Sequence, residues 1–159
     1  MIIVAKFHRI FYKAKYSGFL ETSNFNLCIM SAQRKLLIID DDEETLEALR
    51  VYFRKKEFDV VAAPNGLEGL KILETEHQDF DLVLTDIVMP NVSGVGVISV
   101  VKKKYPHLST IAITGWGEHP EALASEAKAD LVLKKPFELS QLETIIKNLI
   151  SRKSKSTPA

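Results

Sequence analysis

The chain has 159 residues, of which 46% are hydrophobic and 26% are charged, a length that suits one domain and a composition that excludes a disordered or collagen-like chain. The formal net charge is zero, but residues 1–35 carry +5, residues 36–150 carry −8 and residues 151–159 carry +3. An acidic central segment argues against direct nucleic-acid binding, because contact with phosphates needs clustered Lys and Arg. It is compatible with a site that binds a cation.

Cys28 is the single cysteine, so the chain can form neither an intramolecular disulfide nor a cysteine-based zinc site. This favours a reducing compartment, and we expect a cytoplasmic protein. The apolar runs near the N-terminus fall far short of the roughly 20 residues that cross a bilayer, so no membrane span is predicted.

Residues 1–34 do not fit the pattern of the rest of the chain. We interpret them as a basic N-terminal extension, disordered or the product of a mis-assigned start, with Met30 as the expected initiator. The alternative is a basic amphipathic arm that contacts a membrane surface or a partner, since Ile3, Phe7 and Ile10 have roughly helical spacing with basic residues between them.

From residue 35 onward, short apolar runs alternate with amphipathic segments, which is typical of βαβ units. Five runs rich in Val, Ile and Leu predict strands buried on both faces: Leu36 to Ile39, Phe58 to Ala62, Asp81 to Leu84, Thr110 to Ile113 and Leu131 to Leu133. Five segments predict helices: Leu46 to Phe53, Leu67 to Leu73, Val95 to Lys104, Glu121 to Lys128 and Leu139 to Ile150. Parallel strands joined by right-handed crossovers give an open sheet with helices on both faces.

Carboxylates follow two of the predicted strands. The first strand ends in Asp40, Asp41 and Asp42, and the third ends in Asp86. Carboxylates that point into one crevice repel each other, and a hard cation such as Mg²⁺, which prefers oxygen ligands, removes this repulsion. Asp42 has a simpler explanation, because it suits the N-cap of the following helix.

A hydroxyl and an ammonium follow the last two predicted strands. Thr114 ends the fourth strand, and Lys135 follows the fifth. Alone, Thr114 would be an ordinary strand residue and Lys135 a solvated charge. At the same edge as the aspartates, they would bind phosphoryl oxygens, and the set as a whole predicts an acyl-phosphate site.

Four stretches together resemble the signature sequences of the receiver domain of two-component response regulators, the CheY-like family. They are Leu36 to Asp42, Leu82 to Gly94, Ile113 to Gly115 and Lys135 to Phe137. The resemblance covers residues 35–150, with 151–159 as a polar tail. It implies the α/β class and a (βα)5 flavodoxin-like, doubly wound fold of five parallel strands in the order 2-1-3-4-5.

The resemblance also implies a role for each residue of the site. Asp86 would be the phosphoacceptor, which becomes an aspartyl phosphate. Asp41 and Asp86 would bind Mg²⁺ directly, the Val88 backbone carbonyl would be a further ligand, and Asp40 would act largely through a water molecule. The resemblance makes Thr114 and Lys135 the groups that contact the phosphoryl group, and the Lys135–Pro136 peptide bond would be cis.

As implied by the resemblance, the phosphodonor would be a sensor histidine kinase or a histidine phosphotransfer protein. The domain would catalyse its own phosphorylation and dephosphorylation without turnover of an external substrate. Residues 138–159 leave room for one helix and a tail, so we expect a single-domain regulator that signals to an unknown partner protein by a conformational change. Val132 departs from the family, which usually has an aromatic switch residue there.

Two other functions fit parts of the sequence. A haloacid-dehalogenase-like phosphatase has the motif Asp-x-Asp-x-Thr, which Asp41 to Thr45 approximates with Glu43 in place of the second aspartate. A phosphorylation-independent interaction module would keep its activity in an Asp86→Asn variant. The four histidines show no metal-ligand spacing, and we expect them on the surface: His8, His77, His107 and His119.

Overall fold

The computed structural model describes residues 33–115, 122 and 128–156. Five parallel strands in this part of the chain form one sheet in the order β2-β1-β3-β4-β5. The strands are β1 (Lys35–Ile39), β2 (Asp59–Ala63), β3 (Leu82–Asp86), β4 (Ser109–Thr114) and β5 (Leu131–Lys134). The α-helices are α2 (Glu43–Lys55), α3 (Gly66–Glu76), α4 (Gly94–Lys104) and α6 (Leu139–Ser156). The predicted flavodoxin-like fold is confirmed.

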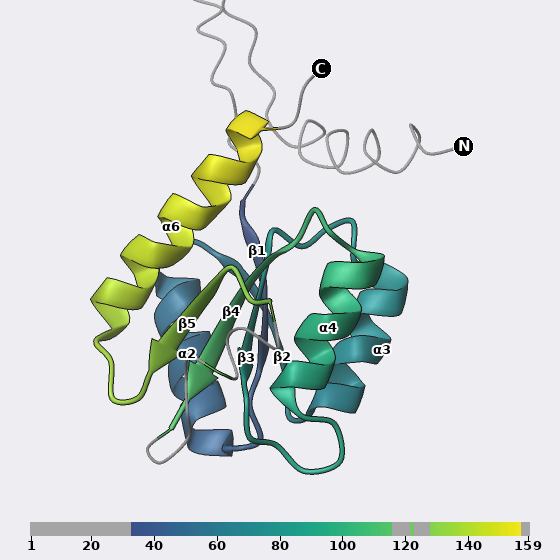
Figure 1. Ribbon diagram of the computed structural model, residues 1–159. Helices are drawn as coiled ribbons and strands as arrows, with labels where there is room; N and C mark the ends of the chain where they lie inside the picture. The colour runs from purple at the N-terminus through teal and green to yellow at the C-terminus, as the bar shows by residue number, and fades with distance from the viewer. Residues whose placement is uncertain (1–32, 116–121, 123–127, 157–159) are drawn as a thin grey trace, which may run out of the picture. The chain divides into compact units, whose positions relative to one another are not determined.

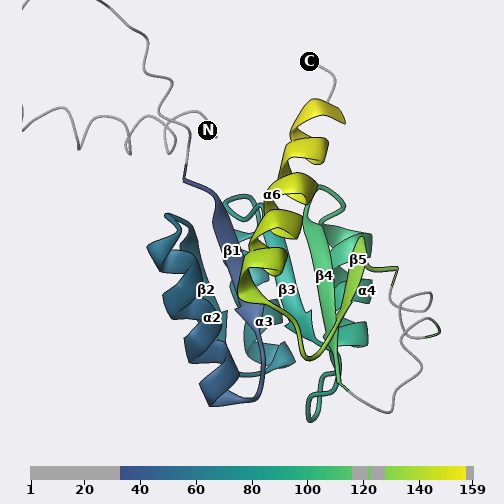
Figure 2. The ribbon, with the colours of Figure 1, turned by 90° about the vertical axis from the view of Figure 1, so that its left-hand side faces the viewer.

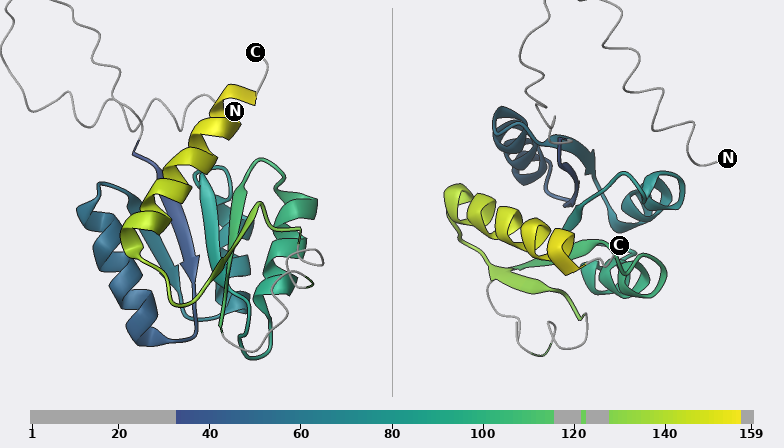
Figure 3. Two further views of the ribbon diagram at one scale, coloured as in Figure 1. Left: turned by 60° about the vertical axis from the view of Figure 1, so that its left-hand side comes forward. Right: turned by 90° about the horizontal axis from the view of Figure 1, so that it is seen from above.

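The helices lie in two layers, one on each face of the sheet. Helices α2 and α6 cover one face and α3 and α4 cover the other, as the views along and above the sheet show (Figure 1, Figure 3). Along β1, Leu36 and Ile38 point to the α2–α6 side, and Leu37 and Ile39 point to the α3–α4 side. Because both faces are covered, the strands are continuous apolar runs without polar alternation.

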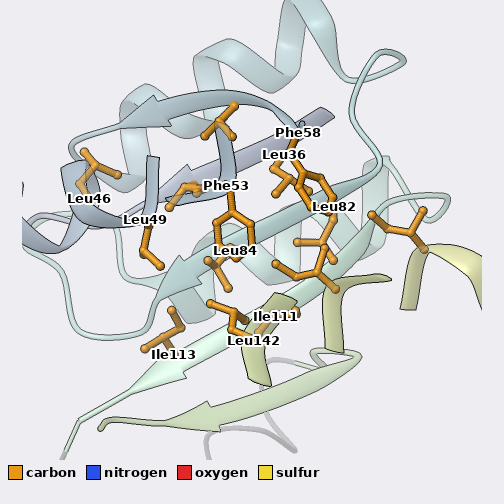
Figure 4. Close-up of a cluster of buried hydrophobic side chains, with 14 residues drawn as sticks. Leu36, Leu46, Leu49, Phe53, Phe58, Leu82, Leu84, Ile111, Ile113 and Leu142 are labelled. Atoms are coloured by element: carbon orange, nitrogen blue, oxygen red, sulfur yellow. The ribbon is translucent and has the colours of Figure 1, made fainter. Parts of the chain in front are cut away.

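The larger apolar core lies between the sheet and the α2–α6 layer (Figure 4). Phe53 of α2 is fully buried there, and its ring packs edge-on against that of Phe58, with 5.6 Å between the centroids. Truncation of a buried aromatic residue to alanine costs about 3–5 kcal/mol. This core fixes α2, and with it the segment that precedes α2 at the carboxyl edge of the sheet.

Side-chain caps set where three of the helices begin. Asp42, Asn65 and Ser93 are the N-caps of α2, α3 and α4, and each side chain accepts a hydrogen bond from a backbone N–H of the first turn. The predicted capping role of Asp42 is therefore confirmed. Helix α6 continues to Ser156, whereas the sequence predicted its end at Ile150 (Figure 2).

Two predictions concern residues outside the ranges that the structure describes. The N-terminal extension lies outside the described residues, and so does nearly all of the predicted helix Glu121 to Lys128. None of the helices within the described ranges is long and apolar enough to cross a bilayer.

Candidate functional site

Strand register brings the predicted site residues to one edge of the sheet. Ile39 of β1 pairs with Thr85 of β3, so the residues that follow these two in the chain, Asp40 and Asp86, lie side by side. On the other side of β3, Asp86 pairs with Ile113 of β4. Thr114 pairs with Lys134, and this places Lys135 just beyond the edge.

The Lys135 ammonium bridges the two aspartates. Its Nζ lies 2.8 Å from Asp86 Oδ1 and 3.4 Å from Asp40 Oδ2. Both carboxylates are buried, with relative exposures of 2% for Asp40 and 7% for Asp86. A buried carboxylate needs a nearby positive charge, and Lys135 supplies one charge between two acids.

Backbone N–H groups hold the other carboxylate oxygens. The N–H of Asp42 donates to Asp40 Oδ1 at 2.9 Å, and the N–H of Val88 donates to Asp86 Oδ2 at 2.8 Å. These hydrogen bonds fix the rotation of both carboxylates before any ligand binds. The backbone of Val88 is thereby tied to the side chain of Asp86, while the Val88 side chain itself is 58% exposed.

The ionisation of this cluster reflects burial and excess negative charge. Burial raises the pKa of Asp40 above its usual value, against the lowering effects of the Asp42 N–H and of Lys135, and the charge of Asp86 raises it further. For Lys135, burial lowers the pKa, but the hydrogen bond to Asp86 and the charges of both aspartates outweigh it, so the pKa is raised. The ammonium therefore stays charged, and one more cation would favour the ionised form of Asp40.

The three consecutive acids divide their roles. Asp40 points into the cluster, whereas Asp42 caps α2 by accepting from the Thr45 N–H at 2.9 Å. Asp41 lies between them and is exposed. Within the described ranges, no group of three or more His, Cys or acidic side chains is arranged to hold a metal ion by itself. Two carboxylates with water and a phosphate oxygen are, however, an ordinary Mg²⁺ ligand set.

Thr114 completes the row of polar side chains at this edge. It is fully buried at the end of β4, and its Oγ1 is 3.3 Å from the Gly115 carbonyl oxygen, to which it donates. The Lys135–Pro136 peptide bond is cis, as the resemblance implied. The structure thus brings Asp40, Asp86 and Lys135 into direct contact and places Thr114 on the neighbouring strand.

Gly94 has a role that sequence reasoning did not identify. A Cβ built on this residue would lie 2.0 Å from the Asp86 carbonyl oxygen, and the Gly94 N–H donates to the Ile87 carbonyl at 2.9 Å. The start of α4 therefore packs directly on the backbone of the candidate phosphoacceptor. The sequence held only a weak signal, a glycine directly before the predicted helix Val95 to Lys104.

Val132, which stands where the family usually has an aromatic residue, packs against a small apolar cluster. The buried members of this cluster are Ile87, Ile98 and Ala112. The cluster joins β3, α4, β4 and β5 next to the site. A valine in this setting has no ring to swing between buried and exposed positions.

A groove of about 660 Å³ lies beside the site, along α2 and the start of α6. Ala48, Val51 and Leu139 contribute apolar surface to it, and Val51 is 41% exposed. The acids of the first turns of α2 line it as well: Glu43, Glu44 and Glu47. The lining residues belong to α2, which begins shortly after Asp40, and to the start of α6, which begins shortly after Lys135.

The fold is a doubly wound α/β domain with buried acids at the carboxyl edge of its sheet, and comparison with known proteins gives its family. The model of the response regulator receiver domain matches residues 36–147. The chain belongs to this family, whose members generally use Mg²⁺.

Curated relatives agree with this assignment. Response regulator SaeR of Staphylococcus epidermidis is 34% identical over 122 residues, which cover 76% of this chain and 52% of SaeR. The chain thus spans about half the length of this relative. Sensor kinase CckA of Brucella abortus is 31% identical over 120 residues, which cover 74% of this chain and 12% of the kinase.

Solved structures show the same fold. A response regulator receiver domain protein of Clostridium thermocellum superposes with a TM-score of 0.73 and 32% identity, covering 78% of this chain and 99% of that one. A CheY-like receiver domain protein of Methanospirillum hungatei gives a TM-score of 0.74 and 27% identity, covering 79% of this chain and 100% of that one. This chain is therefore a receiver domain of the two-component response regulator type.

Proposed function

We propose that this receiver domain accepts a phosphoryl group on Asp86 from the phosphohistidine of a sensor histidine kinase or a histidine phosphotransfer protein, in a reaction that requires Mg²⁺. The observation that carries the proposal is the contact of Lys135 with Asp86, at an edge where Asp40 adds a second buried carboxylate. A nucleophilic carboxylate beside a fixed ammonium is suited to phosphoryl transfer.

The residues present fit a magnesium ion. Asp40 and Asp86 share one ammonium between two negative charges, and burial raises the pKa of Asp40, so the pair lacks one positive charge. Asp40, Asp41, Asp86 and the Val88 backbone carbonyl would hold the ion. When bound, Mg²⁺ would supply charge neutralisation for the transferred phosphoryl oxygens.

The transfer itself is a displacement at phosphorus. A carboxylate oxygen of Asp86 forms a bond to phosphorus as the bond between phosphorus and the donor imidazole nitrogen breaks, and the electron pair of that bond stays on the imidazole. The Lys135 ammonium, already 2.8 Å from Asp86, stabilises charge on the phosphoryl oxygens, and the Thr114 hydroxyl turns from the Gly115 carbonyl to donate to one of them. Hydrolysis of the acyl phosphate at the same site returns the free carboxylate.

The groove beside α2 supports a helical donor. It combines apolar surface at Val51 and Leu139 with acids at Glu43 and Glu44, which complements an amphipathic helix with basic flanks. The sensor kinase CckA contains a segment that resembles this chain, which supports a partnership with kinases of this class.

Signal output would follow from charge and contact changes at the site. Phosphorylation adds about two negative charges at Asp86 and draws Lys135 and Thr114 toward the new oxygens. The resulting shift between two packings of the last third of the domain would alter its affinity for a downstream partner protein.

The test is incubation with acetyl phosphate and Mg²⁺, followed by intact-mass measurement. Wild type and the matched control Asp42→Asn should each gain one phosphoryl group, and Asp86→Asn should gain none. An unmodified wild type would refute the proposal. Steady turnover of p-nitrophenyl phosphate by a nucleophile at Asp41 would instead favour a haloacid-dehalogenase-like phosphatase. Full partner binding by Asp86→Asn, independent of acetyl phosphate, would favour a phosphorylation-independent module.

A further inference from the structure

Two histidines far apart in the sequence meet at the edge of the sheet opposite Asp86. His77 is the C-cap of α3, and His107 lies just after the end of α4. Their ring centroids are 6.1 Å apart, and the ring planes are tilted by 55°. The His77 ring also stacks on Tyr105, with centroids 4.4 Å apart and planes within 22°. The function proposed above uses neither histidine.

Hydrogen bonds to backbone carbonyls set which ring nitrogen carries the proton in each histidine. Nδ1 of His77 lies 3.0 Å from the Leu73 carbonyl oxygen, and Nε2 of His107 lies 3.2 Å from the carbonyl oxygen of His77. A carbonyl oxygen only accepts, so each of these nitrogens donates an N–H. The lone pair of the neutral ring is then on Nε2 of His77 and on Nδ1 of His107.

This arrangement is the one that metal-binding histidines adopt. A ligating imidazole usually donates its other N–H to a carboxylate or a backbone carbonyl, which fixes the tautomer and the ring orientation. Both His77 and His107 have such a bond already, and Tyr105 further holds the plane of the His77 ring. Two neighbouring rings therefore each have one nitrogen engaged and the other left as the ligand atom.

We propose that His77 and His107 bind a late first-row transition-metal ion such as Zn²⁺, with water molecules completing the coordination. Zinc–nitrogen bonds are about 2.0–2.1 Å long, so two imidazole rings that bind the same ion have their centroids roughly 5–6 Å apart. The observed separation of 6.1 Å lies just above this range, so a small shift of the rings would bring both to one ion.

The acidic neighbour of His77 in the chain is already engaged, because Glu76 forms an ion pair with Lys35 at 2.8 Å. The pair thus offers nitrogen ligands, which favour Zn²⁺, Ni²⁺ and Cu²⁺, whereas the oxygen ligands at Asp40 and Asp86 favour Mg²⁺. A metal ion at His77 and His107 would join the C-terminal ends of α3 and α4 without occupying the phosphorylation site.

Zinc titration of the full chain in the presence of saturating Mg²⁺ tests the inference. Long-range ¹H–¹⁵N spectra of the histidine side chains report each ring nitrogen separately. We expect Zn²⁺ to shift Nε2 of His77 and Nδ1 of His107 together, and calorimetry to find a binding event that weakens at least tenfold in His77→Gln and in His107→Gln. The matched control His119→Gln should bind as wild type does.

Three results would overturn the inference. They are the absence of ring-nitrogen shifts at these two histidines, a shift at only one of them, and unchanged affinity in a His77→Gln/His107→Gln double variant whose circular dichroism shows an intact fold. Thermal unfolding gives an independent readout, since Zn²⁺ should raise the midpoint of wild type and leave that of the double variant unchanged.

Discussion

The Lys135 ammonium and the Asp86 carboxylate form a 2.8 Å ion pair that joins two strands which are not neighbours in the sheet. Asp86 ends β3 and Lys135 follows β5, so the contact passes over the end of β4, where Thr114 lies. The proposed nucleophile, hydroxyl and ammonium are thereby held together by three strands of a rigid sheet. Such an arrangement needs little reorganisation during phosphoryl transfer.

Replacement of Lys135 should separate phosphoryl transfer from metal binding. Lys135→Met removes the charge that stabilises the phosphoryl oxygens, and we expect phosphorylation by acetyl phosphate to slow by about 10²–10³-fold. The same change leaves Asp40 and Asp86 without their shared ammonium, so Mg²⁺ affinity measured by calorimetry should rise by about three- to tenfold. Lys134→Met is the matched control and should change neither quantity. Weaker Mg²⁺ binding in Lys135→Met would contradict this account.

Neutralisation of two nearby aspartates should affect stability in opposite directions. In Mg²⁺-free buffer at pH 7, Asp40→Asn should raise the free energy of unfolding, because two buried carboxylates share one ammonium and burial raises the pKa of Asp40, which disfavours its charge in the folded state. Asp42→Asn should lower stability, because the hydrogen bond from the Thr45 N–H lowers the pKa of Asp42.

The stability difference between Asp40→Asn and wild type should depend on pH, because the pKa of Asp40 is raised. As the pH falls through the raised pKa of Asp40, wild type becomes neutral at this position as well, so its stability should approach that of Asp40→Asn. Urea unfolding at several pH values measures both effects. A destabilised Asp40→Asn variant at pH 7 would show that the negative charge of Asp40 does not destabilise the folded protein.

Glu143 should stabilise the contact between α2 and α6 in a pH-dependent way. Its carboxylate accepts hydrogen bonds from Lys147 at 2.6 Å and from the Tyr52 hydroxyl at 2.9 Å, and it pairs with Lys56 at 3.2 Å. These contacts, that of Lys147 first, lower the pKa of Glu143 from 4.5 to about 2. The stabilisation is fully present above pH 4.5 and is lost as the pH falls toward 2.

A Glu143→Gln variant tests this stabilisation. It should unfold at lower urea concentration than wild type at pH 7, and the difference should shrink steadily between pH 4.5 and 2. Glu47→Gln is the control, because Glu47 pairs with Arg50 within α2 alone and should have a smaller effect. A difference that does not depend on pH would mean that the charge of Glu143 contributes nothing.

Two glycines near the site should differ sharply in their tolerance of alanine. At Gly94 a Cβ would lie 2.0 Å from the carbonyl oxygen of Asp86, so Gly94→Ala must shift the backbone and should cost about 2–3 kcal/mol. At Gly115 a Cβ would meet no atom within 4 Å, so Gly115→Ala should change stability by less than about 0.5 kcal/mol. Chemical denaturation measures both, and equal effects would rule out the close packing.

Apolar pattern predicted all five strands, and the polar residues expected at the ends of the third and fourth strands, Asp86 and Thr114, do end β3 and β4. The predicted fifth run stopped at Leu133, whereas β5 ends at Lys134. The ladder of backbone hydrogen bonds does not depend on side-chain polarity, so the last apolar residue does not mark the end of a strand.

Local sequence could place the acids at one edge and assign the helix cap to Asp42, because a helix was expected to follow. It could not show which of Asp40 and Asp41 points into the site, and the resemblance assigned direct metal binding to Asp41. The structure turns Asp40 toward Lys135. The division of metal ligands between Asp40 and Asp41 stays a prediction. The proximity of His77 and His107 could not be predicted from the sequence, because only the packing of α3 against α4 brings the two residues together.

The strand register limits where residues can be inserted into this protein or deleted from it. Asp40, directly after β1, is level with Asp86, whereas Thr114 lies one residue further along β4 and Lys135 follows the end of β5. Deleting a single residue within any of these strands would shift its functional residue out of this register and reverse the face that it presents. Strand lengths should therefore stay fixed, and changes in length should accumulate in loops that carry neither these residues nor His77 and His107.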